Sequence, residues 1–218
     1  MTLATLPGVA GFVLAGGQST RMGRDKALVE LAGRPLIAYV VEALKSVGLS
    51  AQIAGARNDL SAFAPVIWDE TPDAGPLSGI CSALAATSAE WALFLSVDMP
   101  LLPASLIRYL ASYAASTGST VTWVSMNGFA ETFPVVVRRS ALPYLLKELR
   151  EGHASCRAGF HEAASRTGEA IRVLSVEQLA QAGQVQDPRG LPPACWFHNV
   201  NSPQELERAE RWLAGKIA

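Results

Sequence analysis

Charged residues are scarce in this chain of 218 residues. They make up 17% of it, and 18 Lys and Arg stand against 19 Asp and Glu, which leaves a net charge of −1. Charge this low and this balanced gives no basic surface of the kind that generic nucleic-acid binding requires. Half of the residues are hydrophobic, which argues against a disordered chain. We therefore expect a globular protein without a nucleic-acid partner.

Paired cysteines and targeting signals are also lacking. Cys81, Cys156 and Cys195 are odd in number and form no CxxC pair, so free thiols are expected rather than a disulfide framework. His153, Cys156 and His161 match no standard zinc pattern. No Lys or Arg precedes Arg21, and residues 1–20 contain Pro7 and several glycines, unlike a signal peptide or a membrane span. These features predict a cytoplasmic protein with no membrane partner.

Apolar segments of strand length alternate along the chain with segments of helical periodicity. Strands are predicted at residues 9–14, 51–54, 66–68, 91–97, 120–124 and 133–137. Helices are predicted between them, and the last one begins at the capping box Ser202-Pro203-Gln204-Glu205. This order predicts an α/β fold of three layers with a mostly parallel sheet. Residues 152–190 carry the least pattern and are predicted to be an insertion over the functional site.

The segment LAGGQSTRMGRDK, from Leu14 to Lys26, follows the first predicted strand. It matches neither GxGxxG nor GxxxxGK[ST], so neither NAD binding nor P-loop hydrolysis is indicated. Its glycines allow a tight turn that points backbone N–H groups at an anion: Gly16, Gly17 and Gly23. Its cations are enough to face a triphosphate: Arg21, Arg24 and Lys26. A glycine turn followed by a solvated basic patch is the plainer interpretation of such a segment taken alone.

The whole segment reads LAGGxSxRMGxDK, which closely resembles the signature loop of the molybdenum cofactor guanylyltransferases, a family of nucleotidyltransferases. Further motifs are similar to this family at the expected intervals: VIWD at 66–69, GPLSG at 75–79, FLSVDMP at 94–100 and FHNVNSP at 197–203. The resemblance extends from about residue 9 to the last helix, except that residues 152–190 carry no motif of the family. It implies a Rossmann-like nucleotidyltransferase fold, with one domain over residues 1–218.

The resemblance implies Mg²⁺-dependent transfer of GMP from GTP to the terminal phosphate of molybdopterin, with release of pyrophosphate. The attacking phosphate is mostly dianionic at pH 7, so the reaction requires positioning and charge neutralisation rather than a general base. Asp98 is the expected Mg²⁺ ligand, and Lys26 and Arg21 are the expected catalytic cations. Nucleotide contacts are expected at Leu14, Ala15, Gly16, Gly17, Lys26, Asp69, Gly75, Pro76, Leu77, Gly79 and Asp98. The acceptor or metal side is expected at Asn199 and Asn201.

Three features depart from the family pattern. The loop reads RMGRDK where some members have an extra residue, and Ser96-Val97 stands before Asp98 where the family has Pro-Cys. Ala54 stands where the guanylyltransferases often have Asn, which leaves the choice between GTP and CTP open. Cytidylyltransferase relatives typically read LAAG, so the sequence LAGG in this chain favours GTP, as does the GPLSG motif.

Plainer roles and other functions stay open from the sequence. Asp98 and Asp69 are also suited to ending strands, and Asn199 and Asn201 to turns before the capping box. The alternative functions are a cytidylyltransferase or other NTP-transferase with a different phosphorylated acceptor, a nucleotide-sugar glycosyltransferase, and a non-catalytic nucleotide-binding protein. A glycosyltransferase usually has a DxD metal pair, whereas Ser96-Val97-Asp98 contains one Asp. The chain is expected to be a monomer or a small homo-oligomer.

Overall fold

The computed structural model describes residues 6–16, 25–55, 57–69, 75–169 and 171–216. Its main sheet has seven strands in the order β5-β4-β1-β6-β8-β7-β9. Strand β8 is antiparallel to both of its neighbours, β6 and β7, and the other pairings in this sheet are parallel. The sheet is therefore mostly parallel, which confirms the predicted α/β fold class.

All six predicted strands are present. The strands of the main sheet are β1 (Val9–Leu14), β4 (Ala51–Ala54), β5 (Val66–Ile67), β6 (Trp91–Ser96), β7 (Val121–Met126), β8 (Phe129–Arg138) and β9 (Ile171–Ser175). A short antiparallel pair consists of β2 (Glu30–Leu31) and β3 (Arg34–Pro35). Strand β8 begins four residues earlier than predicted, because its first half is exposed or half-buried and lacks an apolar signal.

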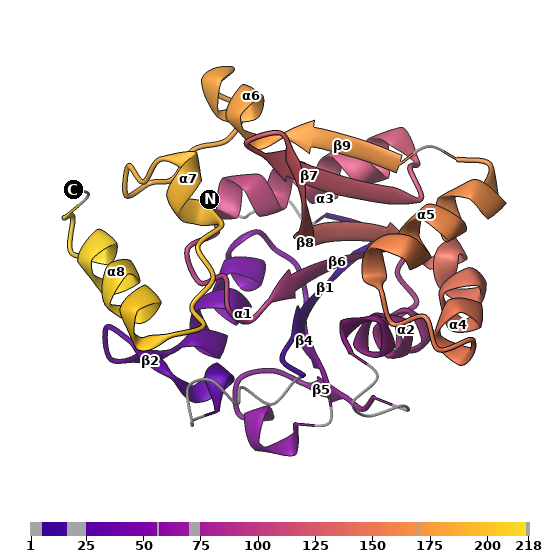
Figure 1. Cartoon of the computed structure of the whole chain (residues 1–218), viewed down its shortest axis with the longest axis horizontal. Helices are drawn as coiled ribbons and strands as arrows, with labels where there is room; N and C mark the ends of the chain where they lie inside the picture. Colours follow the sequence, from indigo (N-terminus) through magenta and orange to yellow (C-terminus); the bar gives the residue numbers. More distant parts are fainter. Residues whose placement is uncertain (1–5, 17–24, 56, 70–74, 170, 217–218) are drawn as a thin grey trace.

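Helices cover both faces of the sheet (Figure 1). They are α1 (Leu36–Ser46), α2 (Pro76–Ala86), α3 (Ala104–Thr117), α4 (Leu142–Arg150), α5 (Cys156–Thr167), α6 (Val176–Gln181), α7 (Pro193–Trp196) and α8 (Pro203–Leu213). Successive β1 side chains point to opposite faces: Val13 joins the core with α1, α3 and α8, and Phe12 joins the core with α2, α4 and α5. No helix in the described ranges has both the length and the apolar character needed to span a membrane.

The prediction that residues 152–190 form an insertion is wrong. Helix α5 packs its fully buried Phe160 against Trp123 of the sheet, with ring centroids 5.5 Å apart, and β9 extends the sheet by pairing with β7. The sequence hid this helix because most of its buried residues are small. A Cβ on Gly159 would lie 3.2 Å from Leu145 Cδ2, so α4 and α5 touch where a larger side chain would not fit.

The parallel strands place three chain segments at one edge of the sheet. Leu14 is in register with Ala54 on one side and with Ser96 on the other, so β1, β4 and β6 end together. A Cβ on Gly55 would lie 3.3 Å from the backbone nitrogen of Gly16, which shows how closely the chain after β4 approaches the chain after β1. Ligands of open α/β sheets bind at this carboxyl edge.

Candidate functional site

Three predicted site residues, distant in sequence, meet at the carboxyl edge of the sheet. Lys26 opens the 3-10 helix η1 (Lys26–Leu28), Asp98 follows β6, and Asn201 precedes α8. Lys26 Nζ lies 2.7 Å from Asp98 Oδ2 and also donates a hydrogen bond to Asn201 Oδ1. The side chains of Lys26 and Asp98 are 18% and 16% exposed, so the ion pair is sheltered but reachable.

Within the described part of the chain, one carboxylate oxygen of Asp98 is left without a partner. Its Oδ1 is buried and has no hydrogen-bond partner among the described residues. A buried oxygen left in this way costs free energy, and carboxylate oxygen is a preferred ligand of Mg²⁺. The other oxygen faces Lys26 rather than the turn that follows, so the interpretation of Asp98 as a simple turn cap is not supported. The residues present therefore fit a divalent cation at Asp98.

The capping box of α8 holds Asn201 in place. The backbone N–H of Val200 donates to the carbonyl oxygen of Asp98 at 2.9 Å, and the N–H of Asn201 donates to Glu205 Oε2 at 2.7 Å. The Ser202 hydroxyl donates to the same carboxylate and accepts from the N–H of Glu205. Burial acts to raise the pKa of Glu205, but these donors outweigh it and lower the pKa below its ordinary value. The predicted N-terminal cap is thus also a support for the site.

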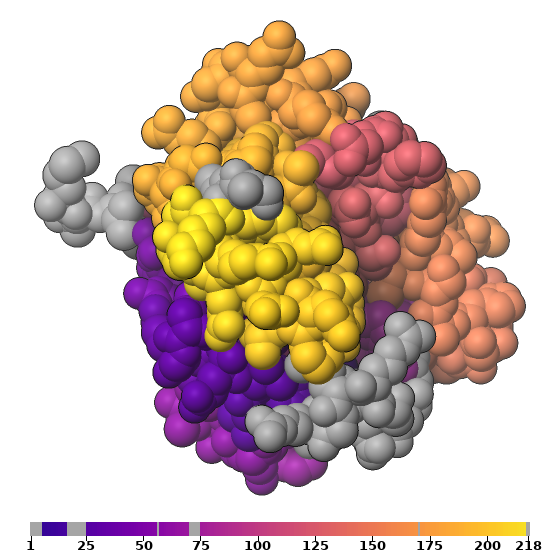
Figure 2. Space-filling model, turned by 60° about the vertical axis from the view of Figure 1, so that its left-hand side comes forward, coloured from indigo at the N-terminus to yellow at the C-terminus, as the bar shows by residue number. Residues whose placement is uncertain are grey.

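The C-terminal segment reaches the site by lying against the first part of the chain. The backbone N–H of Ala32 donates to Glu210 of α8 at 3.3 Å. Figure 2 shows the C-terminal segment in yellow against the indigo N-terminal part, and the surface is hollowed between the yellow and the orange segments. This arrangement brings Asn201 to Lys26.

The described residues at the end of β1 offer backbone rather than side chains to a ligand. Leu14 and Ala15 are buried, and Gly16 is exposed. The N–H of Ala15 donates to the carbonyl oxygen of Ala54 at 3.3 Å, which ties the end of β1 to β4. Contacts of these residues with a nucleotide are therefore expected through the main chain. Gly17 and Arg21, two further predicted site residues, lie outside the described residues.

The GPLSG motif forms the start of α2. Gly75, with φ +79°, precedes the helix, and Pro76 occupies its first position. Leu77 is fully buried and Gly79 faces β1, where a Cβ would lie 3.2 Å from Leu14 Cδ2. The Leu77 side chain thus belongs to the core, and only its backbone is available to a ligand.

Asp69 lies beside α2, and two serine hydroxyls of that helix hold it. Ser78 and Ser82 both donate to Asp69 Oδ1, the second at 3.3 Å, and the Ser78 residue is buried. This arrangement fixes the carboxylate near the helix start. Asn199, by contrast, is exposed, and no side-chain hydrogen bond links it to Lys26 or Asp98 within the described part of the chain.

Sequence reasoning missed Asp25 and Arg57, which brace the start of η1. Asp25 Oδ1 accepts the N–H of Ala27 at 3.0 Å, and its Oδ2 forms an ion pair with Arg57 Nη2. Arg57 also binds Asp59 through two nitrogens, at 3.0 and 2.7 Å. These hydrogen bonds raise the pKa of Arg57 and lower that of Asp59. Asp25 belongs to the LAGGQSTRMGRDK motif, but no feature of the sequence indicated that Arg57 would be its partner.

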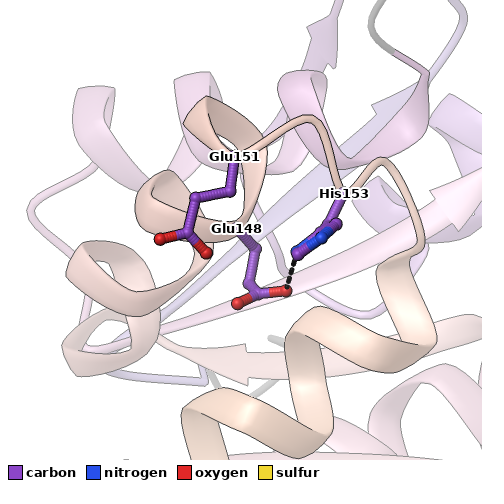
Figure 3. Close-up of side chains that lie close together, drawn as sticks. All are labelled: Glu148, Glu151 and His153. Atoms are coloured by element: carbon purple, nitrogen blue, oxygen red, sulfur yellow. Dashed lines mark hydrogen bonds and ion pairs between the residues drawn. The ribbon is translucent and has the colours of Figure 1, made fainter.

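Glu148, Glu151 and His153 form a second group of potential metal ligands, at the end of α4 (Figure 3). His153 Nδ1 lies 3.0 Å from Glu148 Oε2, and Glu151 pairs with Lys147 at 3.3 Å. These side chains are thus engaged with one another and with their own helix. Their contacts explain the group without a metal.

Comparisons with known proteins show which family the chain resembles. A model of the MobA-like NTP transferase domain matches residues 11–167. The chain is 33% identical over 198 residues to the molybdenum cofactor guanylyltransferase of Vibrio atlanticus, which covers 89% of this chain and 91% of that protein. It is 39% identical over 198 residues to the protein of the same name from Vibrio cholerae, with coverage of 89% and 87%.

A similar fold is found in a solved structure, molybdopterin-guanine dinucleotide biosynthesis protein A from Archaeoglobus fulgidus. The TM-score is 0.75 at 22% sequence identity, and the match covers 94% of this chain and 99% of that one. At this identity, the comparison supports the fold. The matched family residues 11–167 include Lys26, Asp69 and Asp98 but end before Asn201.

Proposed function

The chain belongs to the MobA-like NTP transferase family, and we propose that this nucleotidyltransferase transfers GMP from GTP to the terminal phosphate of molybdopterin and releases pyrophosphate. The observation that carries the proposal is the meeting of Lys26, Asp98 and Asn201 at the carboxyl edge of the sheet. The Lys26 cation can neutralise phosphate charge, and Asp98 Oδ1, which has no partner in the described ranges, can hold a divalent ion. The relatives named molybdenum cofactor guanylyltransferase support the choice of substrates.

In the proposed reaction, the acceptor phosphate attacks the α-phosphorus of GTP and the bond to pyrophosphate breaks. The acceptor is already an anion, so the protein has to hold two anions in line and offset their charge. Lys26 exchanges its contact with Asn201 for a phosphate oxygen and stabilises the negative charge on the leaving pyrophosphate. Arg21 is proposed to share this role from the same loop.

Asp98 is the proposed holder of Mg²⁺, through Oδ1, which has no hydrogen-bond partner among the residues that the structure describes. The ion, when bound, would offset phosphate charge and align the phosphate oxygens. Lys26 fixes the other oxygen of Asp98, so the carboxylate keeps one orientation. Asn201 is proposed to stand on the acceptor or metal side of this carboxylate, and Asn199 to contact the acceptor from the exposed surface next to it.

The nucleotide is proposed to bind along the backbone of Leu14, Ala15 and Gly16, with Gly17 continuing this surface. Asp69 and the start of α2, from Gly75 to Gly79, read the base and the ribose. Ala54 is 1% exposed and lies under α2, so position 54 presents no polar group to the base. Discrimination for GTP therefore falls to Asp69 and to backbone groups.

We further propose that one nucleotidyltransferase domain spans residues 1–218. Support comes from β9 and α8, which lie beyond the matched residues 11–167 but add to the same sheet and the same core. Cytoplasmic location, the absence of nucleic-acid and membrane partners, and a monomer or small homo-oligomer stay predictions from the sequence. The glycosyltransferase and the non-catalytic alternatives do not agree with membership of a nucleotidyltransferase family.

Calorimetric titration of the protein with GTP, CTP, ATP and UTP, each with Mg²⁺, tests the nucleotide. GTP is expected to bind best, and Lys26→Ala to weaken it. Lys45→Ala is the matched control, because Lys45 is a surface lysine that donates to the carbonyl oxygen of Phe63 at 3.2 Å. A preference for CTP would favour the cytidylyltransferase alternative, and equal binding by Lys26→Ala would contradict the role of Lys26.

A further inference from the structure

The short segment after β4 contacts both described ends of the nucleotide loop. At one end, Gly55 lies so close to Gly16 that a Cβ would approach its backbone nitrogen to 3.3 Å. At the other end, Arg57 Nη2 forms an ion pair with Asp25 Oδ2. Two contacts from one segment therefore fix the points where the loop leaves β1 and where it enters η1.

Arg57 is itself held in a defined orientation. Its Nε and Nη2 donate to the two carboxylate oxygens of Asp59, at 3.0 and 2.7 Å, so the planar guanidinium cannot rotate freely. Its side chain is 20% exposed, against 34% for Asp25 and 51% for Asp59. A cation fixed and sheltered in this way is suited to holding Asp25 rather than to binding a ligand from solution.

Asp25 transmits this constraint to Lys26. One of its oxygens caps η1 by accepting the N–H of Ala27, and the other meets Arg57. The cap sets the start of η1, which is the position of Lys26. Asp25 thus holds the backbone at Lys26, and the Lys26 side chain extends from there to Asp98 and Asn201.

We propose that Arg57 is a positioning residue for Lys26, acting through Asp25. The pair Arg57–Asp25 aims the Lys26 ammonium at the phosphate side of the site without itself contacting the substrate. The catalytic consequence rests on the proposed function, but the effect on Lys26 does not, because it exists in the protein without nucleotide.

Three variants and one control test this role. Arg57→Gln removes the charge. Asp25→Asn keeps an oxygen that caps Ala27 but removes the negative charge, and the double variant combines both changes. Arg34→Gln is the control, since it breaks the exposed ion pair of Arg34 with Glu42. Arg57→Lys serves as a second test if Arg57→Gln does not fold, because it keeps the charge and loses the planar fork.

The first readout is the acylation rate of Lys26 in nucleotide-free protein, measured by peptide mass spectrometry with Lys45 as internal reference. Arg57→Gln and Asp25→Asn each remove the Arg57–Asp25 ion pair, whose contribution is about 1 kcal/mol. The acylation rate of Lys26 should therefore rise by roughly fivefold in either variant. The double variant should equal the single variants, because both act through one contact. Arg34→Gln should leave the rate unchanged.

The second readout is turnover, where kcat should fall in the same variants while thermal melting shows folded protein. An unchanged Lys26 acylation rate in folded Arg57→Gln, or independent effects of the two substitutions that multiply in the double variant, would overturn the positioning role. A wild-type protein that transfers no nucleotide would contradict the proposed function instead, and the acylation data would still decide the role of Arg57.

Discussion

Lys26 Nζ and Asp98 Oδ2 lie 2.7 Å apart, although 72 residues separate them in the chain. Each neutralises the other at the sheet edge while nucleotide is absent. Because the pair is sheltered from solvent, removing one partner leaves the other as a poorly compensated charge. The pair therefore joins the loop after β1 to the end of β6 and defines the centre of the proposed site.

Asp98→Ala should abolish transfer while leaving the fold intact. The change removes the proposed Mg²⁺ ligand and the partner of Lys26, so turnover should fall by about a hundredfold or more. Steady-state pyrophosphate release and circular dichroism measure the two properties. A folded Asp98→Ala protein with wild-type turnover would refute the assignment of the metal ligand.

The support of Asn201 by Glu205 should depend on pH. The pKa of Glu205 is lowered in the folded protein from the ordinary value of 4.5, so its ionised form stabilises the fold at higher pH. That contribution is complete above the unfolded pKa and is lost as pH falls through the folded pKa. Urea unfolding of wild type and Glu205→Gln from about pH 7 down to about pH 3 should converge at the acidic end. A stability difference that stays constant across this range would contradict the prediction.

Gly55→Ala should impair GTP binding more than its effect on stability explains. Gly55 has φ +144°, and a Cβ would press on the Gly16 backbone at 3.3 Å. Gly33→Ala is a matched control, because Gly33 has φ +76° but a Cβ there meets nothing within 4 Å. Both variants should lose about 1–3 kcal/mol of stability through backbone strain. Only Gly55→Ala should raise the Kd for GTP, and equal Kd values for the two variants would argue against close packing of the loop.

The three thiols should resist alkylation in the folded protein. Cys81, Cys156 and Cys195 are buried and free, and burial raises the pKa of Cys81 and of Cys156 to about 12. Burial also raises the pKa of Cys195. At about pH 8 the reactive thiolate is therefore rare. A thiol-reactive dye should label all three only after denaturation, whereas rapid labelling of native protein would contradict this arrangement.

Much of the fold follows from local signals in the sequence. Buried parallel strands read as short apolar runs, and the predicted bounds of β1 and β4 agree with the structure. The capping box at Ser202 also marks the start of α8. Helix α5 escaped prediction because small residues, among them Gly159 and Ala163, form much of its buried face.

The site was only partly predictable for a different reason. Motif resemblance pointed to Lys26, Asp98 and Asn201, and the structure brings these three together. The pairing of Asp25 with Arg57 depends on how two loops approach each other in space, and no periodicity records that. Resemblance likewise paired Asn199 with Asn201, but Asn199 is exposed, whereas Asn201 accepts a hydrogen bond from Lys26.

The most direct test of the proposed function is pyrophosphate release by the purified protein with molybdopterin, Mg²⁺ and each of the four nucleotides in turn. Release with GTP in preference to CTP, ATP and UTP, lost in Lys26→Ala and kept in Lys45→Ala, is the predicted result. Release that prefers another nucleotide, or that Lys26→Ala retains in full, would contradict guanylyl transfer at the Lys26–Asp98 site.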